Sequence, residues 1–217
     1  MTSASAVPKS KKQQQFDRHD AFVEYIVDLC RKSTKAQSDL RSGLGRPLEN
    51  CTYLHRYLVP RLSPQDYPDQ QYDDRRRAHY AVASLVAARP RYARDADRAA
   101  VAEAEETGTP LPMPEWWKRP NLGSSLAQGV NKKLLKPTTA EEDLHLMVRQ
   151  SSEALQVRLP ALTQHLLSGG VRIDWSVLLD DLSWWNKDRD RVATRWLESY
   201  FRVRTLEDRN ETQKENG

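Results

Sequence analysis

The segment DWSVLLDDLSWW, from Asp174 to Trp185, places two adjacent carboxylates among three tryptophans. Such residues could form an acidic catalytic pair beside an aromatic platform. Neighbouring residues on a helix diverge by about 100°, however, so Asp180 and Asp181 would not converge on one metal or substrate atom. We therefore interpret the tryptophans and leucines as a packed face, with Asp180 and Asp181 projecting away from it. Asp174 is predicted to cap the helix, and Trp184 to lie off the main apolar face.

No other stretch offers a catalytic arrangement. The five histidines form no H-x-H or H-E-x-x-H pair, and no phosphate-loop or dinucleotide-binding pattern occurs. The SGLG turn at residues 42–45 could expose amides to a phosphate, but such a turn more often ends a helix. Cys30 and Cys51 lack the spacing of a zinc or redox pair, so we interpret both as buried hydrophobes. We therefore expect no enzyme, no cofactor and no metal.

Positive charge is concentrated in two parts of the chain, whose net charge is +4. Residues 31–61 contain seven Lys or Arg and two acids, and residues 115–141 contain five basic residues between the two terminal glutamates. This distribution is typical of a surface that faces a polyanion, although a merely solvated face is the common alternative.

The N-terminal residues 1–15 have lysines but no apolar run, which predicts a disordered basic tail and not a secretory signal. No segment approaches the roughly 18 apolar residues of a membrane span. Together with two unpaired cysteines, these features favour a cytoplasmic protein that does not bind membranes.

Apolar residues recur at helical spacing and not in period-two alternation, so we predict an all-α fold. The predicted stripes are Phe22, Tyr25, Ile26 and Leu29; Leu48, Cys51, Leu54 and Leu58; Ala78, Val82, Leu85 and Val86; Leu122, Leu126, Val130 and Leu134; Leu144, Met147, Val148 and Leu155; and Val192, Trp196 and Tyr200. Thr138 and Thr139 each precede a Glu by three residues, which predicts a helix cap. Pro160 predicts a kink in its helix, and the SGG at 168–170 predicts the end of that helix.

These helices are expected to form two small bundles joined by a proline-rich linker. The predicted organisation is a disordered tail (1–15), an N-terminal bundle (16–89), a linker or surface excursion (90–116), a C-terminal bundle (117–204) and a second disordered tail (205–217).

The string GGVRIDWSVLLDDLSWWNKDRDRVATRWLESYF, residues 169–201, resembles the C-terminal signature of the CasB family. That family is the small subunit of the type I-E CRISPR surveillance complex, Cascade. NLGSSLAQGV from Asn121 is also similar to the family, and LRSGLGRPL from Leu40 and RRRAHYAVASLVA from Arg75 are similar more loosely. The resemblance covers most of residues 35–201.

This resemblance implies a non-enzymatic subunit that binds the guide-paired target strand and the displaced strand, and so stabilises the R-loop during antiviral defence. The implied partners are other Cascade subunits, a second copy of the chain, the guide RNA–target DNA heteroduplex and the displaced single-stranded DNA. Carried over by position or by local charge, the nucleic-acid-binding residues are Arg41, Arg46, Arg75, Arg76, Arg77, Lys132, Lys133, Lys136, Arg149 and Arg158.

Two alternatives from other classes remain at this point. A stand-alone helical DNA-binding regulator could carry the same charge distribution, and it would bind a particular duplex sequence by itself. A metal-dependent nuclease built on Asp174, Asp180 and Asp181 is the enzymatic alternative, and it would cleave DNA in the presence of Mg²⁺ or Mn²⁺.

Overall fold

The computed structural model describes residues 10–62, 69–108 and 115–215. These residues form helices and connecting turns, with no strand among them, so the predicted all-α class is confirmed. Prolines 110, 112 and 114 of the predicted linker lie outside the described residues, as do residues 1–9 of the N-terminal tail.

The first two helices, α1 (Lys11–Lys32) and α2 (Thr34–Arg41), begin where a serine can cap them. The side chain of Ser10 accepts a hydrogen bond from the amide of Gln13, and that of Ser33 accepts one from the amide of Ala36. Helix α2 ends at the SGLG turn, as predicted. Residues 11–15, which we expected in the disordered tail, lie in the first turn and a half of α1.

The apolar stripe of residues 48–58 forms short turns and not one continuous helix. The elements are η1 (Leu48–Asn50), η2 (Thr52–Leu54), α3 (His55–Leu58) and η3 (Val59–Arg61). Cys51 has φ −120° and ψ 27°, which interrupts the helical path between the first two turns. Cys51, Leu54 and Leu58 are nevertheless buried, so the stripe identified the inward-facing residues correctly.

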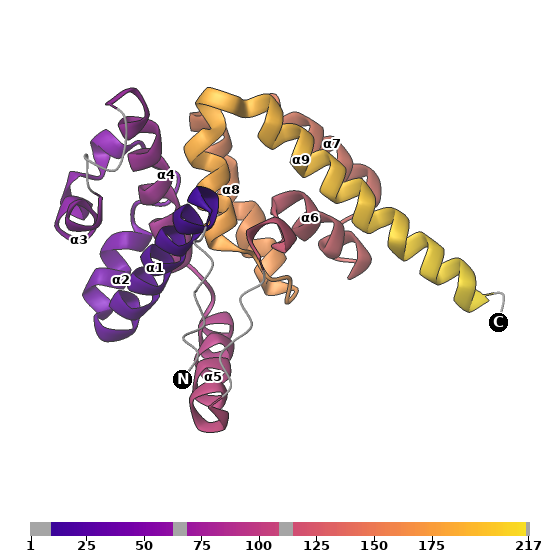
Figure 1. Cartoon of the computed structure of the whole chain (residues 1–217), viewed down its shortest axis with the longest axis horizontal. Coiled ribbons are helices and arrows are strands. Elements are labelled where there is room, and N and C mark those ends of the chain that lie inside the picture. The colour runs from indigo at the N-terminus through magenta and orange to yellow at the C-terminus, as the bar shows by residue number, and fades with distance from the viewer. Residues whose placement is uncertain (1–9, 63–68, 109–114, 216–217) are drawn as a thin grey trace, which may run out of the picture.

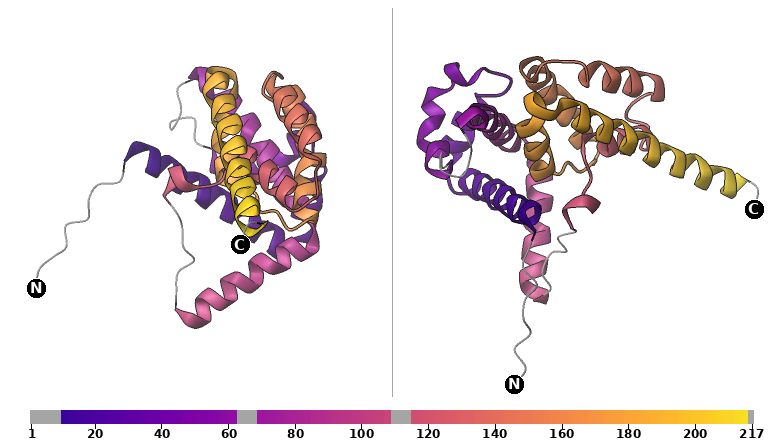
Figure 2. Two further views of the ribbon diagram at one scale, coloured as in Figure 1. Left: turned by 90° about the vertical axis from the view of Figure 1, so that its right-hand side faces the viewer. Right: turned by 45° about the horizontal axis from the view of Figure 1, so that its top comes forward.

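Helix α4 (Asp69–Ala87) carries the buried residues Ala78, Val82 and Val86 on its inner face. Helix α5 (Arg91–Thr107) then projects from the body of the molecule (Figures 1 and 2). The linker expected at residues 90–116 therefore contains a 17-residue helix. The end of this linker falls in the single turn η5 (Trp116–Lys118).

Three helices follow: α6 (Leu122–Asn131), α7 (Pro137–Met147) and α8 (Ser152–Ser168). The prediction that Thr138 or Thr139 caps α7 is wrong, because the helix begins at Pro137 and Lys136 occupies the cap position. Proline suits the first helical position, since the amide it lacks would have no partner there. Helix α8 continues through Pro160, and the SGG segment ends it as predicted.

The last element, α9, runs from Trp175 to Glu215 and contains a break at Asp188, where φ is −146° and ψ is 48°. Asp174 caps it as predicted, because its Oδ1 accepts a hydrogen bond from the amide of Val177 at 3.0 Å. Residues 205–215, which we expected to be disordered, are helical. The C-terminal end of α9 extends beyond the rest of the chain (Figure 1).

Helix α9 is the main packing partner for both halves of the chain. Helices α4 and α6 make the most extensive contacts with it, and α1 also packs on it. The closest approach is at Gly123 of α6, where a Cβ atom would lie 1.9 Å from the carbonyl oxygen of Trp196. Buried residues from both halves form one continuous core, so the division into two bundles remains a prediction.

Candidate nucleic-acid interface

Three of the predicted contact residues are exposed and lie at or just after the ends of helices. Arg41 ends α2, Arg46 follows in the turn after it, and Arg149 lies between α7 and α8. Arg149 lines a shallow hollow along α7 together with Glu141, His145 and other residues of that helix. These side chains can reach a phosphate without breaking any contact of the core.

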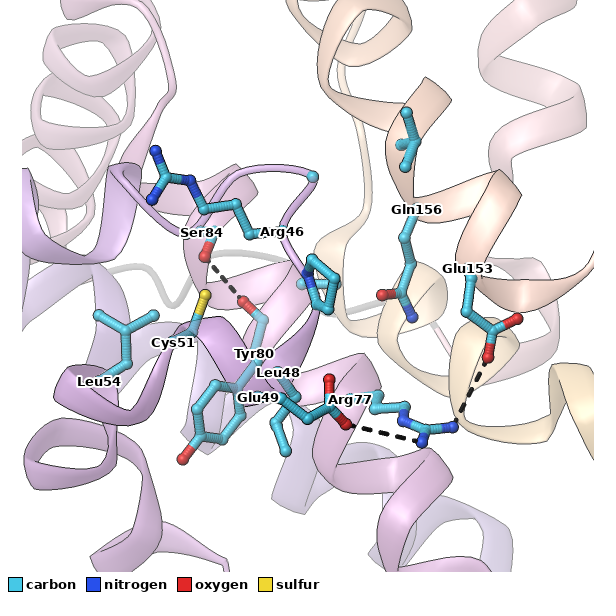
Figure 3. Close-up of a pocket in the computed structure, with 15 residues that line it drawn as sticks. Arg46, Leu48, Glu49, Cys51, Leu54, Arg77, Tyr80, Ser84, Glu153 and Gln156 are labelled. Atoms are coloured by element: carbon cyan, nitrogen blue, oxygen red, sulfur yellow. Dashed lines mark hydrogen bonds and ion pairs between the residues drawn. The ribbon is translucent and has the colours of Figure 1, made fainter.

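The turn that carries Arg46 lies against α8, so residues distant in sequence meet. A Cβ atom on Gly45 would lie 3.8 Å from both Val157 and Pro160 of α8. Between the turn, α4 and α8 is a cavity of about 150 Å³ whose lining includes Arg46, Arg77 and Gln156 (Figure 3). We call this junction of the 42–49 segment, α4 and α8 the seam.

Arg77 and Arg158 belong to the same region but are held by acids. The guanidinium of Arg77 lies 3.6 Å from Glu153 and 3.9 Å from Glu49. Both ion pairs are drawn in Figure 3. Arg158 donates a 2.8 Å hydrogen bond to Asp143 of α7. Sequence reasoning named both arginines but missed these acids, because no local pattern indicates which acid faces a cation across two elements.

Two of the predicted contact residues point inward. Arg75 is 8% exposed, and its guanidinium lies over the Trp184 ring at 5.3 Å. Arg76 donates to Nε2 of His55 at 3.0 Å. We therefore leave Arg75 out of the proposed surface, since a phosphate could reach it only after the chain had rearranged.

The lysines at positions 132, 133 and 136 form a separate group at the α6–α7 turn. All three are exposed; Lys132 donates to the carbonyl oxygen of Gly170 at 2.7 Å, and Lys133 has φ 60°. Helix α7 separates this turn from Arg149 by its length, roughly 16 Å at 1.5 Å per residue. The two groups can therefore contact phosphates well apart on a nucleic acid.

The acidic residues of the opening motif are buried, which corrects our expectation that Asp180 and Asp181 project away from the packed face. Asp180 is 1% exposed and accepts hydrogen bonds from Lys12 and Gln15 of α1, each at 2.7 Å. Helix α1 covers the side of α9 that the sequence pattern marked as polar. Burial lowers the pKa of Lys12, although its contact with Asp180 opposes that shift.

Asp181 is completely inaccessible to solvent. It forms an ion pair with Arg195, which lies beyond the break in α9. It also accepts a 2.7 Å hydrogen bond from the indole Nε1 of Trp196. Asp174 and Asp20 together hold Arg119 through four hydrogen bonds of 2.7–2.8 Å. Burial would lower the pKa of Arg119, but the hydrogen bonds to Asp20 and Asp174 raise it above its ordinary value.

The tryptophans of the motif pack as predicted. Trp175 and Trp185 are buried, whereas Trp184 is only partly buried, with Arg75, Lys187 and Arg191 around its ring. Within the described ranges, no group of three or more His, Cys, Asp or Glu is placed to hold a metal ion. No described helix is long and apolar enough to cross a membrane.

Residues 36–201 match the family model of CRISPR-associated protein Cse2. The chain belongs to the Cse2 family. The resemblance seen in the tryptophan-rich motif is thereby confirmed. One similar solved structure is a chain of a "CRISPR RNA-guided surveillance complex", with 32% identity and a TM-score of 0.73, and the match covers 91% of this chain and 99% of that one.

Two further structures agree with membership of the Cse2 family. A chain of a "CRISPR RNA-guided surveillance complex, pre-nicking" is 34% identical with a TM-score of 0.73, and the match covers 90% of this chain and 98% of that one. M. ruber CasB is 26% identical with a TM-score of 0.62, over 88% of this chain and 96% of that one. No curated protein matches the sequence.

Proposed function

We propose that this chain is a non-catalytic small subunit of a type I-E CRISPR RNA-guided surveillance complex. Its membership of the Cse2 family and its likeness to chains of surveillance complexes support this role. Its proposed partners are the other Cascade subunits, a second copy of itself, the guide RNA–target DNA heteroduplex and the displaced single strand. The proposed site of action is the cytoplasm.

The proposed activity is to bind the target and displaced strands and so stabilise the opened DNA. The observation that carries this proposal is the position of Arg41, Arg46 and Arg149, which are exposed and are contributed by both halves of the chain. Arginines that contact phosphates release counterions, so binding is independent of sequence and weakens with salt. Lys132, Lys133 and Lys136 extend the proposed contacts along α7.

Such contacts matter because strand exchange is nearly balanced. When a guide RNA displaces one DNA strand, the heteroduplex formed is about as stable as the duplex that is lost, as described for another class of RNA-guided effector. A few backbone contacts of about 1 kcal/mol each therefore shift the equilibrium toward the opened state. The target sequence is recognised by base pairing with the guide, and this subunit shifts the equilibrium toward the opened DNA.

The test is the double variant Arg41→Ala with Arg149→Ala in the reconstituted complex. At about 1 kcal/mol per contact, target affinity should fall roughly 30-fold. The slope of log K against log salt should become shallower by about the contribution of two phosphate contacts. The matched control is Arg91→Ala on the projecting helix α5, whose side chain is 88% exposed. Unchanged affinity in the double variant, with the fold intact by circular dichroism, would reject this surface.

A further inference from the structure

Arg77 lies at the seam, and its guanidinium is close to three acidic side chains. Its guanidinium is 3.6 Å from Glu153 at the start of α8, 3.9 Å from Glu49 in η1 and 4.0 Å from Asp74 on its own helix. Figure 3 shows the two ion pairs that reach Arg77 from the neighbouring elements. The positive charge of Arg77 is thus neutralised by carboxylates, and these carboxylates themselves repel phosphate.

These two ion pairs are weak enough to exchange. The side chains of Glu49 and Glu153 are both 66% exposed and that of Arg77 is 37% exposed, so water and salt screen the attraction. Exposed pairs of this kind contribute between about 0.2 and 1 kcal/mol. A phosphate held in place by other contacts can therefore displace the glutamates from Arg77.

Glu153 is also held independently of Arg77. A hydrogen bond from its own backbone amide at the start of α8 lowers the pKa of this carboxyl, so it stays ionised at neutral pH. Its charge remains at the seam when Arg77 turns toward another partner. Glu49, by contrast, lies in the short turn η1 beside the exposed Arg46.

We propose that Glu49 and Glu153 limit the affinity of the seam for nucleic acid. They occupy Arg77 and repel phosphate, so the seam binds passing nucleic acid poorly. A strand presented by the assembled complex is already anchored by Arg41, Arg46 and Arg149, and it then takes Arg77 from the two glutamates. This inference rests on the proposed function and adds a restraint, because only a strand held by the other arginines engages Arg77.

The test compares Glu49→Gln and Glu153→Gln in the reconstituted complex, with affinity measured for a non-target duplex and for the target duplex. Each variant should tighten non-target binding about two- to fivefold, and the salt dependence should steepen by about one phosphate contact. Target binding should tighten by at least as much, because the strand there no longer has to displace a glutamate from Arg77. Tightening of both affinities, with the change on the target duplex at least as large, is the expected signature.

A double-mutant cycle separates release of Arg77 from simple removal of negative charge. In the Arg77→Ala background, Glu153→Gln should have a smaller effect, since only the repulsion between its carboxylate and the phosphate is removed there. An equal gain with and without Arg77, or no gain in either variant, would overturn the inference. Glu106→Gln on α5 makes the same charge change on an exposed residue of the projecting helix and should leave both affinities unchanged.

The failure of this inference is distinguishable from failure of the proposed function. If Arg41→Ala with Arg149→Ala weakens target binding but the glutamate variants behave like the parent, only the role of Glu49 and Glu153 is wrong. If the arginine variants bind target normally, the contact surface itself is wrong. Thermal unfolding of each variant excludes a folding defect at the start of α8.

Discussion

At the scale of single residues, burial decides what the carboxylates of the DWSVLLDDLSWW segment do. Asp181 is inaccessible, paired with Arg195 and hydrogen-bonded to the indole of Trp196. A carboxylate in this position cannot bind a catalytic metal without first losing both partners. The arrangement therefore favours a structural role for Asp181 over the nuclease alternative.

Asp181→Ala should lower the free energy of unfolding by about 3 kcal/mol, because it leaves the Arg195 guanidinium and the indole N–H without their buried partner. Urea unfolding at neutral pH measures this change. Asp190→Ala is the control: its side chain is 98% exposed, and the free energy of unfolding should change by less than about 0.5 kcal/mol. Equal stability of the two variants would contradict the structural role of Asp181.

The buried histidines predict a loss of stability in acid. His79 packs edge-on against Phe22 with ring centroids 4.6 Å apart, and burial lowers its pKa to about 4. Its Nδ1 donates to the carbonyl oxygen of Arg75 at 2.6 Å, which opposes the lowering of the pKa but does not outweigh the effect of burial. His19, 6.1 Å away, has its pKa lowered in the same direction, mainly by burial.

In the unfolded chain His79 titrates near its ordinary pKa of about 6.5, so protons bind the unfolded state first. The stability that neutral His79 provides is complete above that value and is lost as the pH falls toward 4. Between pH 7 and pH 5 the free energy of unfolding should fall by about 2 kcal/mol from this residue. Urea midpoints at the two pH values should differ less in His79→Gln, whereas replacing the partly exposed His145 should leave the difference intact.

At the scale of elements, the close crossing of α6 and α9 depends on a missing side chain. A Cβ atom on Gly123 would meet the backbone of Trp196 at 1.9 Å, whereas one on Gly129 would meet side-chain atoms of Leu166 and Leu135, the nearest at 2.7 Å. Gly123→Ala should therefore cost about 3 kcal/mol and Gly129→Ala about 1 kcal/mol. Chemical denaturation of both variants gives the comparison, and similar costs would mean that α6 and α9 separate easily.

The helices could be predicted from the sequence where one apolar face decides them. Phe22 and Ile26 of α1 and Val192 and Trp196 of α9 are buried as their spacing indicated. The spacing could not show that α1 covers a second face of α9, because that depends on two helices more than 140 residues apart in the sequence. Asp180 was misjudged for this reason, since its partner Lys12 lies in a segment expected to be disordered.

At the scale of the whole molecule, the basic residues of the candidate interface could be named from the sequence, but their availability could not. Arg41, Arg46 and Arg149 are exposed, whereas Arg75 is buried with its guanidinium over the Trp184 ring and Arg77 is paired with acids from two other elements. Only tertiary packing determines which basic side chains remain accessible to a phosphate. The acids that neutralise the others leave no local trace in the sequence.

The most direct test of the central claim is the target-duplex affinity of the reconstituted surveillance complex with and without this chain, at two salt concentrations. We expect that omission weakens binding, that adding the chain back restores it, and that the restored part declines steeply with salt. An affinity unchanged by omission at both salt concentrations, together with a chain that does not co-purify with the complex, would contradict the proposed role.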